Sequence, residues 1–193
     1  METWPQIRKW RAHERQRLVA ARMAFRGAER QHCDGAIIAA LSGIVPRGTS
    51  VGFYWPIRGE TDLREFVSGL LDHGARLSLP VVVEKRTPVE FRAWHPNALM
   101  TSGVWNIPVP AEGERVRPEV LLVPLVGFDD RCYRLGYGAG YYDRTLAKLP
   151  RGTLAIGVGY ELSHLSTIYP QPHDIPMSII VTEARVIRRS SQT

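Results

Sequence analysis

A glycine-rich segment near residue 138 carries the residue types best suited to phosphate chemistry. It lies between a predicted buried strand and a predicted helix and reads Arg134-Leu135-Gly136-Tyr137-Gly138-Ala139-Gly140-Tyr141-Tyr142-Asp143-Arg144. Alternate glycines let the backbone approach an anion with its amides turned inward, and the start of a helix adds positive potential. Arg134 offers a forked donor for phosphate, and Asp143 offers a hard oxygen ligand. The combination predicts a site for a magnesium-bound nucleotide.

The glycine spacing differs from that of two common nucleotide-binding motifs. The segment lacks the Lys-Ser/Thr ending of a Walker loop, and its third glycine comes one residue too early for a dinucleotide fingerprint. Two plainer explanations therefore stay open. The glycines could form only a tight turn, and Asp143 could be a carboxylate that favours the positive end of a helix dipole.

The composition is that of an ordinary globular protein. Of the 193 residues, 44% are hydrophobic and 23% are charged, which excludes a disordered or fibrous chain and predicts one domain over residues 1–193. No apolar run approaches the roughly 18 to 20 residues of a membrane-spanning helix, and the first ten residues lack the apolar stretch of a secretory signal. We therefore expect a cytoplasmic protein. Cys33 and Cys132 give neither a disulfide framework nor a Cys-x-x-Cys zinc site.

The positive charge of the chain comes almost entirely from arginine. The net charge is +6, and Lys9, Lys85 and Lys148 are the only lysines among 25 basic residues. Because a guanidinium group donates in a planar fork, this bias favours recognition of phosphate or carboxylate. The partner could be a small polyanion or a nucleic acid. The nucleic-acid reading is the weaker one, since the sequence shows neither an RNA-binding aromatic motif nor a helix-turn-helix signature.

The order of elements follows from the hydrophobic pattern. Apolar periodicity predicts helices over residues 5–25, 28–41, 63–71 and 141–149. Asp62 is expected to cap the third of these helices together with Glu65, and Gly74 to end it. Apolar runs predict strands over residues 51–55, 76–83, 89–94, 120–128, 153–160 and 178–187. Residues 95–118 hold four prolines and are expected to form a long irregular connection.

The first predicted helix has two distinct faces. One face is apolar and is expected to be buried. It consists of Ile7, Trp10, Leu18, Ala21 and Phe25. Another face carries Arg11, Arg15, Arg22 and Arg26. For the last three arginines we expect a solvated basic face.

Alternation of strands and helices predicts an α/β fold. We expect a three-layer αβα single domain with a mostly parallel sheet and helices on both faces. In such sheets, ligands bind beyond the carboxyl ends of the strands. The loops after Trp55, Phe128 and Tyr160 are therefore the predicted places for a site.

The glycine segment also resembles a known family. Residues 134–144, with Val123-Pro124 and Phe128-Asp129 before them, are similar to the signature of 5-formyltetrahydrofolate cyclo-ligases. Three further segments also resemble that family. Residues 54–62 are similar to its folate loop, residues 11–18 to its nucleotide-binding first helix, and residues 173–183 to its C-terminal end. The resemblance thus spans nearly the whole chain.

The resemblance implies an ATP-dependent ligase that uses Mg²⁺. Its reaction would convert 5-formyltetrahydrofolate and ATP into 5,10-methenyltetrahydrofolate, ADP and phosphate. The formyl oxygen is a poor leaving group, and its phosphorylation by ATP would allow phosphate to depart when the neighbouring N10 attacks. Catalysis would then consist mainly of alignment and charge neutralisation. The expected partners are these two small molecules, and the chain is expected to be a monomer.

The resemblance also assigns roles to individual residues. The expected ATP contacts are Arg8, Lys9, Arg11, Arg134, Leu135, Gly136, Tyr137, Gly138, Ala139, Gly140, Tyr141 and Tyr142. The expected folate contacts are Trp55, Glu60, Tyr137, Gly138, Ala139, Gly140 and Tyr141, and the expected catalytic residues are Arg134, Tyr137 and Tyr141. Asp143 and Asp174 are the expected metal ligands, although Asp174 could simply form a turn. Glu60 would bind the nitrogens of the pterin ring, or it could be only an acid that precedes a helix.

Three features depart from the family pattern. Cys132 stands where the family commonly has a glycine, which is unfavourable if the turn needs a positive φ. Ala139 replaces the middle glycine of a triplet, and a backbone cradle accepts it if its φ is negative. Residues 106–110 lack the acid that often precedes the family's proline. These departures leave open an ATP-using enzyme of the same fold that acts on another small molecule.

Overall fold

The main sheet is mixed, with a parallel centre. The computed structural model describes residues 3–190. Its eight-stranded sheet contains, in spatial order, β12 (Val186–Arg188), β11 (Ile179–Val181), β10 (Leu154–Val158), β7 (Val120–Pro124), β1 (Ser50–Gly52), β2 (Arg76–Val81), β3 (Glu90–Trp94) and β6 (Arg115–Val116). The pairings from β11 to β2 are parallel, whereas β12, β3 and β6 join antiparallel. The predicted α/β fold with a mostly parallel sheet is confirmed.

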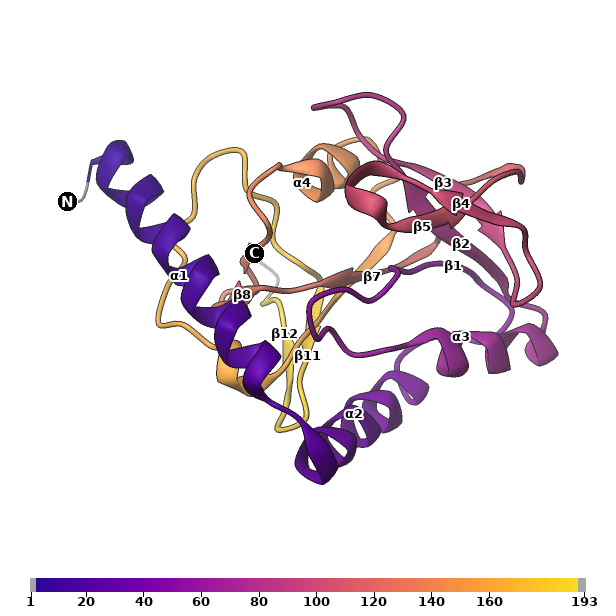
Figure 1. Cartoon of the computed structure of the whole chain (residues 1–193), viewed down its shortest axis with the longest axis horizontal. Helices are drawn as coiled ribbons and strands as arrows, with labels where there is room; N and C mark the ends of the chain where they lie inside the picture. Colours follow the sequence, from indigo (N-terminus) through magenta and orange to yellow (C-terminus); the bar gives the residue numbers. More distant parts are fainter. Residues whose placement is uncertain (1–2, 191–193) are drawn as a thin grey trace.

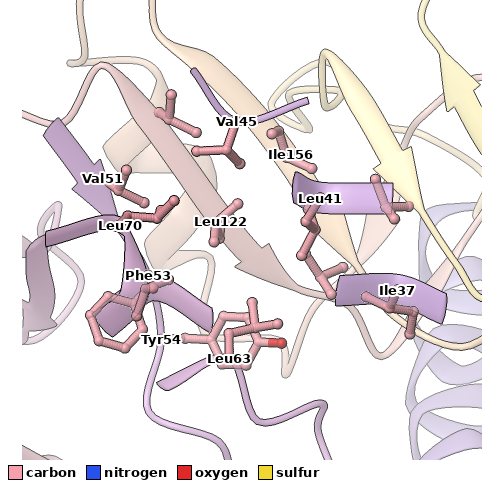
Figure 2. Close-up of a cluster of buried hydrophobic side chains, with 14 of the residues drawn as sticks. Ile37, Leu41, Val45, Val51, Phe53, Tyr54, Leu63, Leu70, Leu122 and Ile156 are labelled. Atoms are coloured by element: carbon pink, nitrogen blue, oxygen red, sulfur yellow. The ribbon is translucent and has the colours of Figure 1, made fainter. Parts of the chain in front are cut away.

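Helices cover both faces of this sheet. The α2 helix (Gly27–Ser42) and the α3 helix (Arg64–Leu70) lie on one face, and α4 (Tyr141–Leu146) lies on the other (Figure 1). Side chains of β7 alternate between the two faces, as a strand requires. Leu122 packs among residues of α2 and α3, as Figure 2 shows, while Leu121 and Val123 belong to the opposite cluster. The molecule therefore has the three layers that the sequence predicts.

The first helix, α1 (Trp4–Ala24), presents a different face to the protein than its apolar pattern predicts. Its buried residues are Ile7, Arg11, Glu14, Leu18 and Arg22. Trp10 and Phe25 are only half-buried, and Ala21 is exposed. The expected apolar stripe is therefore wrong in part, because the arginine face points inward. The reason lies in the carbonyl and carboxylate groups that meet these arginines, which a periodicity analysis does not detect.

Two of the predicted strands are each split in the structure. The chain leaves the main sheet after β7, and β8 (Gly127–Phe128) pairs with β9 (Arg134–Leu135) in a separate two-stranded sheet. Residues predicted as a single strand over 178–187 form the antiparallel pair β11 and β12. The Thr182 hydroxyl accepts the backbone N–H groups of Ala184 and Arg185 and builds the turn between them. The predicted strand over 51–55 is also shorter, since β1 ends at Gly52.

The connection over residues 95–118 is more regular than predicted. It contains a hairpin of β4 (Met100–Ser102) and β5 (Pro108–Pro110), with the short 3₁₀ helix η2 (Val104–Asn106) at its tip. Strand β6 then joins the edge of the main sheet. The expectation of an irregular loop is therefore wrong for these three strands.

The helix boundaries follow the sequence signals more closely. The Asp62 carboxylate accepts the backbone N–H of Arg64 at 3.0 Å, although no contact from Glu65 completes a capping box. After α3, the 3₁₀ helix η1 (Leu71–His73) ends at Gly74, which has a φ of +80°. A further 3₁₀ helix, η3 (Glu161–Ser163), follows β10. Among residues 3–190, no helix combines the length and apolar character needed to span a membrane.

Candidate active site

Arginines of α1 join the three loops in which the sequence predicts a site. Arg22 donates to the carbonyl oxygen of Arg58 at 3.0 Å, in the loop after β1. Arg15 Nε donates to the carbonyl oxygen of Gly136 at 2.7 Å, in the glycine segment. Arg11 donates at 2.9 Å to the carbonyl oxygens of Ile168 and Tyr169, in the loop after β10. The first helix therefore fastens the loops at the carboxyl ends of the central strands.

The glycine segment has the backbone geometry of a cradle. Gly138 has a φ of +97° and Gly140 a φ of +68°, values that strongly favour glycine. Ala139 lies between them with a φ outside the left-handed region, which satisfies the condition for replacing a glycine there. The α4 helix begins directly after Gly140. The segment therefore combines a backbone that strongly favours glycine with a helix start, an arrangement that suits phosphate binding.

Two guanidinium groups that the sequence analysis did not assign to the site lie against this cradle. A Cβ placed on Gly138 would lie 3.4 Å from Arg15 Cζ, and one placed on Gly140 would lie 3.0 Å from Arg144 Nη1. Arg144 also donates to the carbonyl oxygen of Ala139, and its buried Nε lacks a partner among the described residues. Arg15 and Arg144 thus bring positive charge to the place where an anion would sit.

Arg134 and Asp143 form an ion pair beneath the glycine segment. Arg134 Nη2 lies 3.0 Å from Asp143 Oδ1, and the Arg134 side chain is only 4% exposed. Arg134 Nη1 donates to the carbonyl oxygen of Ile175 at 2.8 Å, while Asp143 Oδ1 accepts the backbone N–H of the same residue at 3.0 Å. The pair therefore also holds the loop that contains Asp174.

Asp174 is the counter-ion of Arg11 in this structure. Arg11 Nη2 lies 2.5 Å from Asp174 Oδ2, and both side chains are less than a tenth exposed. The same oxygen accepts the backbone N–H of Gln171 at 2.7 Å. Burial raises the pKa of Asp174, but the hydrogen bonds from Arg11 and Gln171 outweigh burial and hold the pKa below its ordinary value. Asp174 thus has a structural role, and its metal role stays a prediction.

The donor set fits Mg²⁺ bound mainly through a nucleotide. Among the described residues 3–190, no group of three His, Cys, Asp or Glu side chains could hold a metal ion by itself. Within the same residues, Asp143 Oδ2 accepts no hydrogen bond, although Oδ1 is occupied. Mg²⁺ is commonly held by one or two carboxylates together with phosphate oxygens and waters. Asp143 offers one such carboxylate oxygen beside the cradle.

The basic residues in α1 and just after it differ in their exposure to solvent. Arg8 and Lys9, which the resemblance assigns to ATP, are exposed. Arg26 is exposed as expected and Arg15 is partly buried, but Arg22 is only 2% exposed, so its predicted solvated position is wrong. Leu135, another expected ATP contact, packs its side chain in the cluster beneath α1. Its contribution to a nucleotide site would therefore come from its backbone.

Glu60 lies in a buried network that links the loop after β1 to the glycine segment. Its carboxylate accepts the Tyr137 hydroxyl at 2.7 Å and the backbone N–H of Ile57 at 2.9 Å. Arg22 Nη2 donates to the same hydroxyl at 2.6 Å and lies 3.8 Å from Glu60 Oε1. Burial raises the pKa of Glu60, and the charge of Arg22 opposes that rise. Tyr137 therefore contacts both predicted binding regions.

Aromatic side chains lie in the loop after β1 and beside the glycine segment. Trp55 is partly buried, with the Arg64 guanidinium 4.6 Å above its ring. Together with Trp94, these residues line a hollow of about 410 Å³. Beside the glycine segment, Trp105 is 66% exposed, and its ring lies 5.8 Å from that of Tyr141. The β4–β5 hairpin thus brings an aromatic residue to the glycine segment, a contact that the sequence analysis missed.

A buried turn before the glycine segment explains how Cys132 is accommodated. Cys132 is fully buried and has a φ of +64°, so this position does adopt the conformation that glycine favours. Its carbonyl oxygen accepts the backbone N–H of Met177 at 2.8 Å. The Asp129 carboxylate accepts backbone N–H groups of Arg131, Tyr133 and Ile168. These bonds fix the turn despite its unfavourable φ.

Comparisons with known proteins agree with the geometry. A model of the 5-formyltetrahydrofolate cyclo-ligase family matches residues 7–183. The 5-formyltetrahydrofolate cyclo-ligase of Mycolicibacterium smegmatis is 34% identical over 76% of this chain and 80% of its own length. The corresponding protein of Mycoplasma pneumoniae is 27% identical over 88% of this chain and 96% of its own.

Solved structures agree over nearly the full length. The NMR structure of 5,10-methenyltetrahydrofolate synthetase from Aquifex aeolicus matches with a TM-score of 0.81 and 33% identity, covering 95% of both chains. The synthetase from Mycoplasma pneumoniae matches with a TM-score of 0.73 and 26% identity, covering 90% of this chain and 98% of its own. Together with the family match over residues 7–183, these likenesses show that the chain belongs to the 5-formyltetrahydrofolate cyclo-ligase family.

Proposed function

We propose that this protein uses ATP to convert 5-formyltetrahydrofolate into 5,10-methenyltetrahydrofolate, with release of ADP and phosphate. The family match over residues 7–183 carries this proposal. The site supports it, because a glycine cradle with flanking arginines lies next to a buried carboxylate that could hold a pterin ring. Nucleotide and folate would therefore bind side by side.

The proposed reaction has two steps. The formyl oxygen attacks the γ-phosphorus of ATP, the bond to the bridging oxygen breaks, and ADP leaves. N10 of the folate then attacks the activated formyl carbon, the carbon–oxygen bond breaks, and phosphate departs with that oxygen. N10 loses its proton, and the product is a cyclic amidinium ion. The protein mainly has to align the reactants and neutralise charge.

The glycine segment would hold the triphosphate. Backbone amides of residues 136–140 would contact the phosphates, a role that the positive φ values of Gly138 and Gly140 support, and Arg15 and Arg144 lie against the same two glycines. The buried Nε of Arg144 supports this role, because a phosphate oxygen would give it the partner that it lacks among the described residues. Arg8 and Lys9 are candidate contacts for the distal phosphates. Arg11 would act indirectly, since Asp174 and two carbonyl groups already occupy its guanidinium.

Asp143 is the proposed ligand of Mg²⁺, which when bound would neutralise charge on the phosphate oxygens. Arg134 would keep the Asp143 carboxylate oriented through the 3.0 Å ion pair between them. Arg134, Tyr137 and Tyr141 stay the proposed catalytic residues. Asp174 would become a second ligand only if Arg11 released it.

Glu60 is the proposed anchor of the pterin ring. An ionised carboxylate there would accept hydrogen bonds from the amino and amide nitrogens of the ring, in part by displacing the Tyr137 hydroxyl. Trp55 and residues 137–141 would supply the surrounding contacts. The exposed ring of Trp105 would add an aromatic wall beside Tyr141.

The proposal is tested by an enzyme assay. The purified protein is mixed with 5-formyltetrahydrofolate, ATP and Mg²⁺, and the near-ultraviolet absorbance of the methenyl product is followed. We expect product only when all three are present, with one ADP formed for each product. Failure to form product at saturating substrate would reject the function.

Three further properties belong to the same proposal. We propose that residues 1–193 form one domain, because the family match and the solved relatives extend over almost all of the chain. We also propose that the protein is a monomer and acts in the cytoplasm. Sedimentation at micromolar concentration tests the first of these two properties, and localisation of a tagged chain tests the second.

A further inference from the structure

Arg22 is a buried charge that the family resemblance assigns to no role. It lies in the last turns of α1 and is only 2% exposed. Its guanidinium donates to the carbonyl oxygens of Arg58 at 3.0 Å and Leu125 at 2.7 Å, and to the Tyr137 hydroxyl at 2.6 Å. Burying a guanidinium costs free energy unless its donors are satisfied. Here they are satisfied by three segments that lie far apart in the sequence.

We infer that Arg22 is the positioning residue of the folate-binding carboxylate: it orients Glu60 through their 3.8 Å contact and through the shared Tyr137 hydroxyl. The inference rests on the proposed function, because it assumes that Glu60 receives the pterin ring. Arg22 is placed to act through Glu60 and Tyr137.

Fixed contacts prevent Arg22 from moving away from Glu60. Two of its hydrogen bonds are to backbone carbonyl groups, which side-chain rotation cannot displace. The loop also packs tightly against the helix, since a Cβ on Gly59 would lie 3.2 Å from the Arg22 carbonyl oxygen. The distance between the guanidinium and the carboxylate is therefore set by the fold.

The other groups near Glu60 do not replace Arg22. Arg58 lies in the same loop but is exposed, and Arg30 of α2 donates to the backbone carbonyl of Glu60 at 3.0 Å. Tyr137 donates its hydroxyl to the carboxylate, while burial and then the charge of Glu60 raise the pKa of Tyr54 and of Tyr142, so that neither supplies a charge beside it. In the described part of the chain, Arg22 is the cation in ion-pair contact with the Glu60 carboxylate.

Removal of Arg22 should therefore change the protonation of Glu60. Burial already raises the pKa of Glu60, and Arg22 is the largest influence that lowers it. A protonated Glu60 cannot accept two hydrogen bonds from the pterin nitrogens as well as a carboxylate does. The rate constant kcat/KM for the folate should fall as the pH falls through the pKa of Glu60. Without Arg22, this fall should occur at higher pH.

The experiment compares the wild type with Arg22→Met, Arg22→Lys, Glu60→Gln and the Arg22→Met/Glu60→Gln double variant. Arg17→Met is the matched control, because Arg17 lies on the same helix and is half-exposed beside Glu14. For each protein, KM values for folate and ATP are measured, together with the pH dependence of kcat/KM for the folate.

We expect Arg22→Met to raise the folate KM at least about tenfold, with less than about a twofold change for ATP. The acidic limb of its pH profile should move to higher pH than in the wild type. Arg22→Lys should show the acidic limb at the same pH as the wild type, because lysine keeps the positive charge. Arg22→Met should have a much smaller effect in the Glu60→Gln background, where no carboxylate remains to be ionised.

Several outcomes would overturn the inference. An unmoved acidic limb in Arg22→Met, equal changes in both KM values, or an undiminished effect in the Glu60→Gln background would show that Arg22 is only a structural support. If Arg22→Met does not fold, two other observations decide whether Arg22 acts through Glu60. They are the pH at which kcat/KM of Arg22→Lys falls and whether the double variant folds. An unfolded double variant would again indicate structural support. An inactive wild type would instead overturn the proposed function and this assignment with it.

Discussion

The glycine segment and the loop around Glu60 are built in opposite ways. Residues 136–140 offer backbone groups from one continuous stretch, and positive φ values at Gly138 and Gly140 orient them. Glu60 offers one side chain, 5% exposed, whose partners come from α1, from the glycine segment and from the backbone of its own loop. The first region therefore derives its chemistry from local conformation, and the second derives it from tertiary contacts.

The two regions meet at Tyr137, whose hydroxyl lies between Arg22 and Glu60. Residues 137–141 are proposed to contact both substrates, so changes in the glycine segment should act more strongly on ATP and metal than on the folate, whereas changes around Glu60 should act mainly on the folate. Variants that act on both substrates equally would contradict this expectation.

The largest effect is expected for Asp143→Asn. The amide can still accept the backbone N–H of Ile175, so the fold should persist, but the negative charge for Mg²⁺ and Arg134 is lost. We expect kcat to fall by more than about a hundredfold. The Mg²⁺ concentration for half-maximal activity should also rise, which a magnesium titration of the rate measures.

Asp72→Asn is the control for this change, because Asp72 is exposed on η1, outside the loops of the site. It should leave the rate and the magnesium titration as they are in the wild type. An Asp143→Asn protein with a near-normal kcat would exclude Asp143 as the metal ligand.

The next largest effect is expected for Glu60→Ala. Loss of a buried, charged hydrogen-bond acceptor costs about 1.5 to 3 kcal/mol, or roughly a tenfold to a hundredfold rise in the folate KM. The KM for ATP should change much less. Steady-state kinetics with each substrate varied in turn provide the measurement, and equal rises for both substrates would contradict the assigned role.

A smaller effect is expected for Gly138→Ala. A side chain at a φ of +97° is strained, whereas the new Cβ itself would make only ordinary van der Waals contact with the Arg15 guanidinium. A cost of about 1 to 2 kcal/mol predicts a rise of roughly tenfold in the KM for ATP. Gly136→Ala offers the comparison, since its Cβ would meet open space and its φ is not left-handed. A rise for Gly136→Ala as large as that for Gly138→Ala would argue against the cradle.

The smallest effect is expected for Trp55→Ala. Its ring is partly buried beneath Arg64, and an aromatic contact of this kind contributes about 0.5 to 1.5 kcal/mol. The folate KM should therefore rise by roughly twofold to tenfold, with the ATP KM unchanged. Isothermal titration with the folate checks the result, and unaltered binding would remove Trp55 from the site.

The contrast between the two regions also explains what the sequence could predict. The glycine segment was recognisable because Gly136, Gly138 and Gly140 lie in one short stretch between Arg134 and Asp143, and this continuous pattern resembles the signature of a known family. The central strands and the first two helices were also predictable from local sequence.

Features that depend on distant partners were not predictable. Arg22 was assigned to solvent because its partners lie at least 36 positions away in the sequence. The turn between β11 and β12 carries no glycine or proline, and the Thr182 side chain builds it instead. Trp105 reaches Tyr141 only because the β4–β5 hairpin brings it there.

The most direct test of the central claim follows the formyl oxygen itself. 5-Formyltetrahydrofolate labelled with ¹⁸O in the formyl group is converted in the presence of ATP and Mg²⁺, and the released phosphate is analysed by mass spectrometry. We expect each phosphate to carry the label, because the formyl oxygen is phosphorylated before it leaves. Phosphate without the label, formed alongside the methenyl product, would contradict this mechanism.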